Sequence, residues 1–509
     1  MVRSISAAAA LLLLAGCTVG PNFSTPDWLS PTTWFAKKPE ATAAAKSLPV
    51  AEPIDPNWWN LFNDPQLTAL EHRVADENLD VQAATVRLAE SRAQLGIAGA
   101  AQFPSLNGNA SYTHQKASDV GVFANAPNAL GANGASGSTA GGIGSRQLAP
   151  FNVYQVGFDA TWELDLWGRV SRSVESSKAS VEASAEARRD ILLTNLAEVA
   201  RDYIQLRGTQ ALLQIARDNV KTSQQSLQLT QQRAAGGVTT DLDVANAAAQ
   251  LRTTAAEIPR LEQQEAQEVN AISLVLGLPP NALQNELIVP KPVPPIPPRV
   301  PVGLPSELAR RRPDIRQAEA NLHAATADIG VAVANFYPSV TLNGSLGLQA
   351  IQPWRMFDLN ARQYTAGPGI SIPLFEGGRL KATLELRKAQ QQEAAINYQK
   401  VVLTAWHEVD NALTAYQTEQ ARRDQLIQAV AQNQRALGLA QSRYQEGVAD
   451  FLQVLTAQHN LLSTQQQLAL ATTNVSANLV ALYKALGGGW ETQMPRANDD
   501  LSPLGAPHL

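Results

Sequence analysis

Cysteine is nearly absent from this chain, since Cys17 is the only one among its 509 residues. A single cysteine excludes an intramolecular disulfide. Histidine is also scarce: the six histidines stand at positions 72, 114, 323, 407, 459 and 508, with no HExxH pattern or other metal-ligand spacing. No Ser-His-Asp arrangement, P-loop or GxGxxG segment follows an expected strand. The sequence therefore predicts no enzyme, no catalytic residue, no metal and no cofactor.

Strong charge and long apolar runs are missing too. The net charge of −5 is small for this length, so nothing points to a nucleic-acid partner. The one long apolar run, Ile5 to Ala15, follows Arg3 and is too short for a membrane-spanning helix. A basic residue, a short apolar segment and small residues before a cleavage point are typical of a secretory signal, which we place at residues 1–16.

Cys17 stands directly after this signal, in Leu14-Ala15-Gly16-Cys17. The segment resembles the bacterial lipobox, which implies cleavage before Cys17 and a covalent lipid, such as palmitate, on that residue. The alternative is a buried free thiol, but nothing near Cys17 is patterned like a core. Thr18 follows where an aspartate would favour retention in the inner membrane. We therefore expect an outer-membrane lipoprotein in which residues 17–56 form a lipid-anchored, extended N-terminal segment.

Internal repetition is the pattern around which the chain is organised. Three glycine-containing pairs are 210 residues apart: Gly237 with Gly447, Gly168-Arg169 with Gly378-Arg379, and Leu276-Gly277 with Leu486-Gly487. One offset that holds over roughly a hundred residues indicates two structural repeats. The predicted parts are a first repeat at 57–277, a proline-rich linker without helix or interior strand at 278–305, a second repeat at 306–488, and a tail at 489–509.

Each repeat has room for a very long helix, because no proline interrupts the chain from Phe151 to Ile258 or from Leu374 to Met494. Such helices are expected at 170–233 and 380–443, each a rod of roughly 95 Å, and a further helix at about 66–101. The long helices carry apolar residues at spacings of three and four, a heptad pattern for which an ordinary coiled coil is the alternative interpretation. These residues are Leu196, Val199, Tyr203, Leu206, Leu213, Val220 and Leu227, then Trp406, Val409, Leu413, Tyr416, Ile427, Val430 and Leu437.

The apolar period changes to two in four other segments. Each segment has about ten residues with one apolar and one polar face, as a transmembrane barrel strand requires, although half-buried strands of a soluble sandwich are the alternative. Pro368 and Pro373 disagree with a regular fourth strand, which is therefore expected to be bulged or shorter. The strands are predicted at about 105–114, 151–164, 339–349 and 364–374, with outward-facing loops at 116–150 and 350–363.

Four strands cannot close a barrel, and their edges cannot stay bare in lipid. Copies of the chain must therefore associate, and three copies in cyclic symmetry would supply twelve strands. The expected fold is a mixed membrane α/β protein. Four transmembrane strands from each chain complete a 12-stranded trimeric barrel, which is continued by a long periplasmic α-helical barrel. A ring of about twelve helices is too wide to be filled by side chains, so the helices would enclose an open conduit.

Four motifs resemble those of a known family, in the same order and over nearly the whole mature chain. They are Trp58-Trp59 with Phe62-Asn63-Asp64-Pro65, Trp162 to Arg169, Arg311 to Ile315, and Pro373 to Arg379. The chain is thereby similar to the TolC-like outer-membrane factors, and more narrowly to the NodT-type lipoprotein branch of efflux outer-membrane channels. The resemblance implies a homotrimeric duct in the outer membrane of a Gram-negative bacterium, extending into the periplasm. It would dock onto a periplasmic membrane-fusion adaptor and an inner-membrane pump, of the RND type, and export small toxic compounds or drugs.

The helix-to-helix turns at 236–240 and 446–450 are the candidate partner sites. Glycine at 237 and 447 permits a tight turn, and the family's adaptor contacts imply this role for Gly236, Gly237, Val238, Thr239, Gly447, Val448, Ala449 and Asp450. Similar channels place an inward aspartate just beyond the second turn. Gln453 and Thr456 occupy the matching positions here, so Asp241 and Asp243 after the first turn are the alternative candidates for narrowing the aperture.

Two other functions fit parts of the pattern. The outer-membrane duct of a type I protein or peptide secretion system would share the fold, although the lipobox and the motif set favour small-molecule efflux. A structural coiled-coil lipoprotein without a pore would explain the long helices and Cys17. It would not explain four alternating segments beside them.

Overall fold

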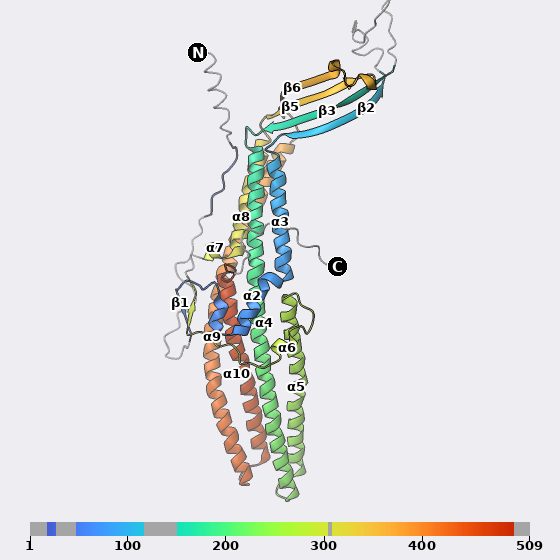
Figure 1. Cartoon of the computed structure of the whole chain (residues 1–509). Helices are drawn as coiled ribbons and strands as arrows, with labels where there is room; N and C mark the ends of the chain where they lie inside the picture. The colour runs from blue at the N-terminus through green and yellow to red at the C-terminus, as the bar shows by residue number, and fades with distance from the viewer. Residues whose placement is uncertain (1–17, 27–46, 117–149, 304–307, 493–509) are drawn as a thin grey trace, which may run out of the picture. The chain divides into compact units, whose positions relative to one another are not determined.

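A computed structural model of the chain describes residues 18–26, 47–116, 150–303 and 308–492. It comprises two compact units (Figure 1). The first, called the sheet unit, comprises Met1–Phe23, Gln94–Lys178 and Ala324–Gln391. The second, called the hairpin unit, comprises Ser24–Ala93, Ala179–His323 and Gln392–Leu509. The signal segment and Cys17 lie outside the described residues.

The sheet unit contains one antiparallel sheet of four strands, in the order β2-β3-β5-β6. The strands are β2 (Ser105–Gln115), β3 (Phe151–Leu164), β5 (Ser339–Ala350) and β6 (Arg362–Ser371). The first three match the predicted ranges to within one residue at either end. Two short 3-10 turns, η4 (Pro353–Arg355) and η5 (Leu359–Ala361), connect β5 to β6.

The two faces of this sheet differ in polarity on all four strands. Phe158 of β3 is paired with Gly108 on one side and Leu346 on the other, and Leu346 is paired with Tyr364. In an antiparallel sheet such paired residues share one face. The neighbouring row lies on the opposite face and is polar: Asn107, Asp159, Ser345 and Thr365. The alternation seen in each separate segment therefore becomes one continuous apolar face and one continuous polar face.

The fourth strand is shorter than the predicted range of about 364–374, as its prolines led us to expect, and it is shifted toward the N-terminus. The strand begins two residues earlier and ends at Ser371, three residues earlier than predicted. Pro373 has no N–H group to donate to the ladder, which explains the early end. Pro368 lies inside the strand, opposite Leu342, and is tolerated because β6 is the outer strand of the sheet.

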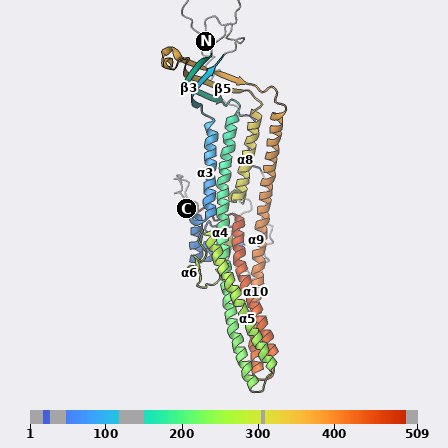
Figure 2. The same ribbon diagram turned by 90° about the vertical axis from the view of Figure 1, so that its right-hand side faces the viewer.

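The two longest helices are α4 (Arg169–Ala235) and α9 (Arg379–Gln445), each of 67 residues. Both start and end within two residues of the predicted limits. Each turns back into a shorter helix, α5 (Asp241–Val275) or α10 (Phe451–Leu486), and the two hairpins lie side by side near their turns in both views (Figures 1 and 2). Among the described residues, none of the helices combines the length and hydrophobicity that a bilayer crossing requires.

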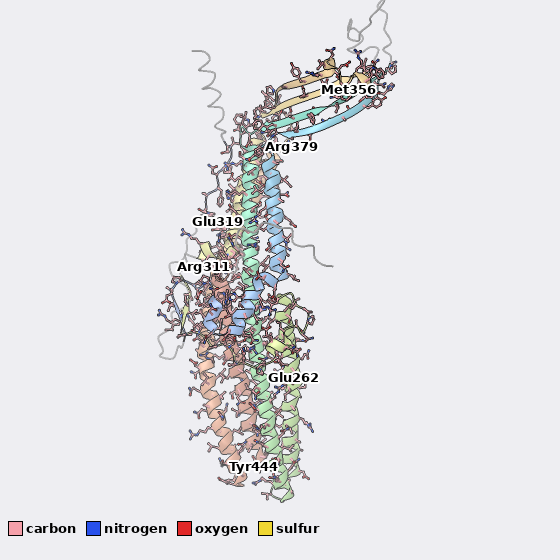
Figure 3. The ribbon with its side chains drawn as sticks, in the orientation of Figure 1. Glu262, Arg311, Glu319, Met356, Arg379 and Tyr444 are labelled. Carbon is pink, nitrogen blue, oxygen red and sulfur yellow. The ribbon has the colours of Figure 1, made fainter. Side chains whose placement is uncertain are left out.

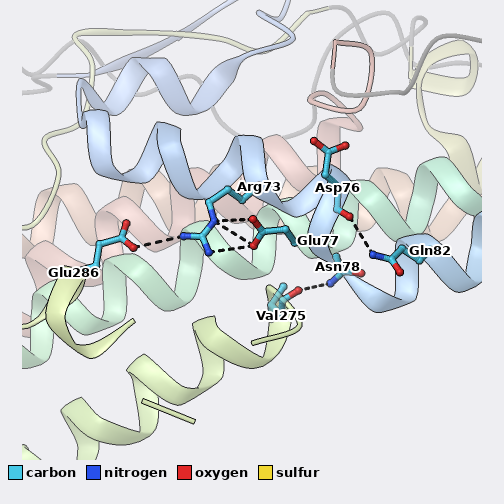
Figure 4. Close-up of polar contacts among 7 residues, drawn as sticks. All are labelled: Arg73, Asp76, Glu77, Asn78, Gln82, Val275 and Glu286. Atoms are coloured by element: carbon cyan, nitrogen blue, oxygen red, sulfur yellow. Dashed lines mark hydrogen bonds and ion pairs between the residues drawn. The ribbon is translucent and has the colours of Figure 1, made fainter. Parts of the chain in front are cut away.

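The helix expected at 66–101 is in fact two helices, α2 (Pro65–Glu77) and α3 (Leu79–Ala100). Asn78 interrupts them in an extended conformation, with ψ 126°. Its side-chain amide donates to the Val275 carbonyl oxygen at 2.6 Å (Figure 4), and its side-chain oxygen accepts the Val81 N–H at 2.9 Å. An Asn side chain that caps the following helix competes with the backbone hydrogen bonds of one continuous helix. The added hydrogen bond to the Val275 carbonyl oxygen therefore favours two separate helices.

The proline-rich linker has more structure than predicted. A one-turn helix, α6 (Gln284–Leu287), forms in the proline-free stretch after Pro280. A short strand, β4 (Arg299–Pro301), pairs in parallel with β1 (Leu48–Val50), which precedes the first repeat. Prolines are accepted here because this two-stranded ladder has only edge strands. The second repeat then opens with α7 (Leu308–Arg311) and α8 (Pro313–Ala334).

The core of the hairpin unit surrounds a short 3-10 helix, η1 (Trp58–Phe62). Trp58 is fully buried, stacks on Tyr483 of α10 with ring centroids 5.5 Å apart, and donates its indole N–H to the Gly488 carbonyl oxygen at 3.1 Å. The heptad residues of α4 are buried from Leu196 to Leu213, whereas in α9 Ile427 is 38% exposed. Val220 and Val430 are also only partly buried, so one chain covers this stretch of the apolar stripe incompletely, whereas Leu437, nearer the second turn, is buried again.

Candidate functional site

The first turn, between α4 and α5, is closed by backbone hydrogen bonds. The N–H of Val238 donates to the Arg233 carbonyl oxygen at 2.9 Å, and the N–H of Gly237 donates to the Ala234 carbonyl oxygen at 2.9 Å. These two bonds define a Schellman motif. Gly237 has φ 71°, the left-handed conformation that the motif requires and that glycine adopts without a Cβ penalty.

The second turn, between α9 and α10, repeats this geometry. Val448 donates to the Arg443 carbonyl oxygen at 2.9 Å and Gly447 donates to that of Tyr444 at 3.0 Å, with Gly447 at φ 76°. The other glycine pairs of the 210-residue repeat are left-handed as well. Their φ angles are 80° and 88° at Gly168 and Gly378, and 66° and 72° at Gly277 and Gly487.

The helices that leave the turns are capped differently. Thr240 and Asp243 form a capping box at the start of α5, and the Asp243 carboxylate also accepts the Thr239 hydroxyl. At the start of α10, the Asp450 carboxylate accepts the Gln453 N–H at 3.2 Å. Both turns are therefore fixed at each end by local hydrogen bonds.

Arg233 connects the two turns within the hairpin unit. Its Nη1 donates to the Gln445 carbonyl oxygen at 3.0 Å, and its guanidinium lies over the Tyr444 ring, 4.7 Å from the centroid. Tyr444 is buried beside Phe451, with ring centroids 5.5 Å apart, at the far end of α9 (Figure 3). The two aromatic rings belong to a small apolar cluster of their own, separate from the main core of the unit.

Both turns carry exposed apolar side chains. Val238 and Val448 are 64% and 65% exposed, and Leu242 and Leu452, on the first turns of the following helices, are also exposed. Each pair is related by the same 210-residue offset. These four residues are called the turn patch. Exposed apolar side chains at corresponding places of two rigid turns are typical of a protein-binding surface.

The structure brings the predicted turn residues together in two similar, neighbouring turns. It does not leave Asp243 free to face an aperture, because its carboxylate is used for capping. Thr456 donates its hydroxyl to the Leu452 carbonyl oxygen, which is also a local bond. Sequence reasoning missed Arg233 and Tyr444, and it missed Leu242 and Leu452, which the repeat offset alone could have identified.

The sheet unit offers a second functional feature, its two edges. Within the described residues, β2 is paired only with β3, and β6 is paired only with β5. Unpaired backbone N–H and C=O groups along two outer strands are open to pairing with another chain.

Comparisons with known proteins all match proteins of the outer membrane. The sequence matches the family described as "Outer membrane efflux protein" over residues 70–278 and 304–488. The toluene efflux pump outer membrane protein TtgC of Pseudomonas putida is 32% identical over 514 residues, which cover 99% of each chain. The probable outer membrane lipoprotein SilC of Salmonella typhimurium is 30% identical, over 94% of this chain and 97% of that protein. The solved structure of the outer-membrane channel OprN has a TM-score of 0.84 and 35% identity, covering 94% of this chain and 100% of that one.

Proposed function

Because the chain belongs to the outer membrane efflux protein family, we propose that three copies of it form the outer-membrane duct of a tripartite efflux system. As a member of this family it is an efflux protein of the Gram-negative outer membrane, and the family consists of channel proteins rather than enzymes. The main observation that supports a trimeric duct is the four-stranded sheet, which has one apolar face, one polar face and two open edges.

Barrel closure follows from these edges. In lipid every backbone polar group needs a partner, so β2 of one copy must pair with β6 of the next. Three copies give twelve strands, with the apolar faces toward the acyl chains and the polar faces toward water. The heptad residues that one chain leaves partly or fully exposed, such as Val220, Ile427 and Val430, are then covered by neighbouring copies, in a periplasmic α-helical barrel.

The turn patch supports a partner at the periplasmic tip. Val238 and Val448 project from turns that are held rigid by Schellman motifs, so binding would cost little ordering of the backbone. We assign Gly236, Gly237, Val238, Thr239, Gly447, Val448, Ala449 and Asp450 to contact with a periplasmic membrane-fusion adaptor. An inner-membrane pump, of the RND type, would then deliver small toxic compounds to the duct.

The aperture candidates differ in whether their side chains already form local hydrogen bonds. The Asp243 carboxylate stabilises the first turn, so its removal would loosen the turn as well as change the charge. Asp241, one residue after the N-cap of α5, is the better candidate for an acidic ring. Gln453 and Thr456 of α10 contribute polar groups without charge.

The lipid anchor on Cys17 is supported by the residues that follow it. Thr18 packs closely against Gly168: a Cβ atom added to Gly168 would lie only 2.8 Å from the Thr18 Cα. The Val19 N–H donates to the Trp167 carbonyl oxygen at 3.1 Å, and Arg172 donates to the Asn22 side chain at 2.6 Å. The chain after Cys17 is therefore held beside the end of β3, where a lipid on Cys17 would enter the membrane next to the barrel.

The test of the duct uses two neighbouring residues of β3 that lie on opposite faces. Phe158→Asp places a charge on the apolar face and is expected to reduce assembly in the outer membrane and single-channel conductance in planar bilayers. Asp159→Ala, the matched control on the polar face, is expected to leave assembly unchanged. If the protein with Phe158→Asp inserts and conducts like the wild type, the sheet does not face lipid.

The alternatives predict different results. A coiled-coil lipoprotein without a pore would give no conductance in any variant. A type I secretion duct would restore protein export, but not resistance to small toxic compounds, in a cell that lacks its own duct. Restored resistance with an RND pump and its adaptor supports efflux.

A further inference from the structure

A cavity of about 310 Å³ lies in the sheet unit, where the strands end and the long helices begin. Its walls come from the end of β3, the end of α8 with the segment that leads into β5, the end of β6 with the segment after it, and the first turns of α4 and α9. Figure 3 shows Arg379, one of its lining residues, at this end of the sheet. It is called the strand-end cavity, and a volume of this size accommodates a small organic molecule.

Two arginines that are equivalent in the internal repeat line this single cavity. Arg169 is the first residue of α4 and Arg379 is the first residue of α9, 210 positions later. Each follows a left-handed glycine, Gly168 or Gly378, so the chain turns sharply before each helix. The repeat therefore delivers the same cationic group to the same place from both halves of the chain.

Each arginine is paired with a glutamate, yet remains the more accessible partner. Arg169 donates from Nε to the Glu163 carboxylate at 2.7 Å, and its side chain is 39% exposed against 26% for Glu163. The side chain of Arg379 is 65% exposed against 32% for its partner Glu376. A guanidinium has five N–H donors, so both arginines keep donors free for a further acceptor.

The remaining walls are mixed. Asp165 adds a third carboxylate, whose oxygens accept the N–H groups of Val170 and Ser171 at the start of α4. The apolar part of the lining is Leu164, Leu166, Ala334, Pro338, Pro373 and Leu380, and the rest is aromatic or polar. Trp167 stacks on Tyr337, with ring centroids 4.8 Å apart, and is fixed by a hydrogen bond from its indole N–H to the Pro338 carbonyl oxygen at 2.8 Å. Ser339 and Ser371 are paired in the sheet and lie on its polar face, as does Glu163. On the proposed function this face lines the duct, so dissolved molecules reach the cavity more readily than lipid.

We propose that the strand-end cavity binds the anionic group of small molecules in the duct, a carboxylate, sulfonate or phosphate, through Arg169 and Arg379. The proposal rests on the proposed function and adds a cargo-binding site to its wall. Arginine suits this role because its planar, permanently charged guanidinium binds such oxygens in pairs. The glutamates hold the guanidinium groups in place and compete with the incoming anion, which keeps binding reversible.

The test measures current blocks by phenyl phosphate in single channels of the purified protein in planar bilayers. In the wild type, short blocks are expected at a frequency that rises with phenyl phosphate concentration. Arg379→Gln is expected to shorten them roughly tenfold, because one charged hydrogen-bond donor is lost. Glu376→Gln is expected to lengthen them, because Arg379 loses its competitor. A purely structural ion pair would instead make both variants change in the same direction.

Arg355→Gln is the matched control, since Arg355, the last residue of η4, is paired with Asp358 and does not line the cavity. It removes one positive charge from the same unit and should leave the blocks unchanged. Equal blocks in the wild type and both cavity variants would overturn the proposal while leaving the duct intact, whereas an absence of conductance would refute the duct itself. Phospholipid that co-purifies with the wild type but not with Arg379→Gln, without an effect of phenyl phosphate, would overturn a dissolved anion as the ligand.

Discussion

Arg233 is the residue whose removal should loosen the tip most specifically. Arg233→Ala removes the contact of the guanidinium with the Tyr444 ring and the 3.0 Å hydrogen bond to the Gln445 carbonyl oxygen. A cation–π contact contributes about 0.5–2 kcal/mol, and a hydrogen bond from a charged group contributes about 1.5–3 kcal/mol. Since Arg233 is partly exposed, solvent weakens both contacts, and we expect the substitution to lower the free energy of local opening of the second turn by about 1.5 kcal/mol in total.

The repeat supplies a matched control. Arg443 has the same position in the second turn, but its side chain is exposed and makes no hydrogen bond or ion pair within the described part of the chain. Arg443→Ala is therefore expected to change the tip little. Both variants remove one positive charge next to the same kind of turn, so a difference between them reports the contacts of Arg233.

Amide hydrogen exchange measures the effect locally. A loss of about 1.5 kcal/mol should speed exchange of the amides at 444–448 roughly tenfold in Arg233→Ala, if they exchange by local opening. Exchange elsewhere in α9 should not change. Wild-type exchange rates at the tip in Arg233→Ala, or equal acceleration in Arg443→Ala, would refute the connection between the turns.

Three further predictions concern stability. Gly447→Ala forces a residue with a side chain into the left-handed region and should destabilise the protein by about 1 kcal/mol. Gly438→Ala, at an open site inside α9, is the control and should stabilise the protein slightly. Unfolding rates in detergent compare the two variants. Glu71 is fully buried without a hydrogen bond to its carboxyl oxygens in the described residues, and burial raises its pKa well above the usual value. Because the folded state holds this proton, stability is lost as pH rises above about 4.5, and Glu71→Met should raise the melting temperature at pH 8 more than at pH 5. Burial also raises the pKa of Tyr416 to about 12, so the neutral hydroxyl contributes fully to the stability of the folded state below about pH 10, and this contribution is lost as pH rises through 12. Melting temperatures between pH 9 and 11.5 should therefore fall less steeply in Tyr416→Phe than in the wild type.

The local features of the fold were predictable because local chemistry determines them. Glycine at 237 and 447 marks the turns, since the Schellman motif needs a left-handed residue there. Alternation marked the strands, and the paired register places Phe158 and Asp159 on the faces that their polarity indicates. The constant 210-residue offset then related the two halves without any knowledge of their packing.

Tertiary contacts account for what the sequence did not predict. The break at Asn78 depends on the Val275 carbonyl oxygen, almost 200 residues away, so the helical pattern through residues 66–101 gave no sign of it. Arg233 meets Tyr444 across two different hairpins, a contact that no periodicity encodes. The strand-end cavity likewise depends on how the turns before α4 and α9 converge.

The central claim is that three lipid-anchored chains complete one barrel, and native mass spectrometry of the detergent-extracted mature protein tests it most directly. The account predicts a trimer in which each chain begins at Cys17 and carries an acyl mass. A monomer or an even-numbered assembly would contradict the twelve-stranded closure. A trimer whose Cys17 is unmodified would contradict the lipid anchor while leaving the barrel in place.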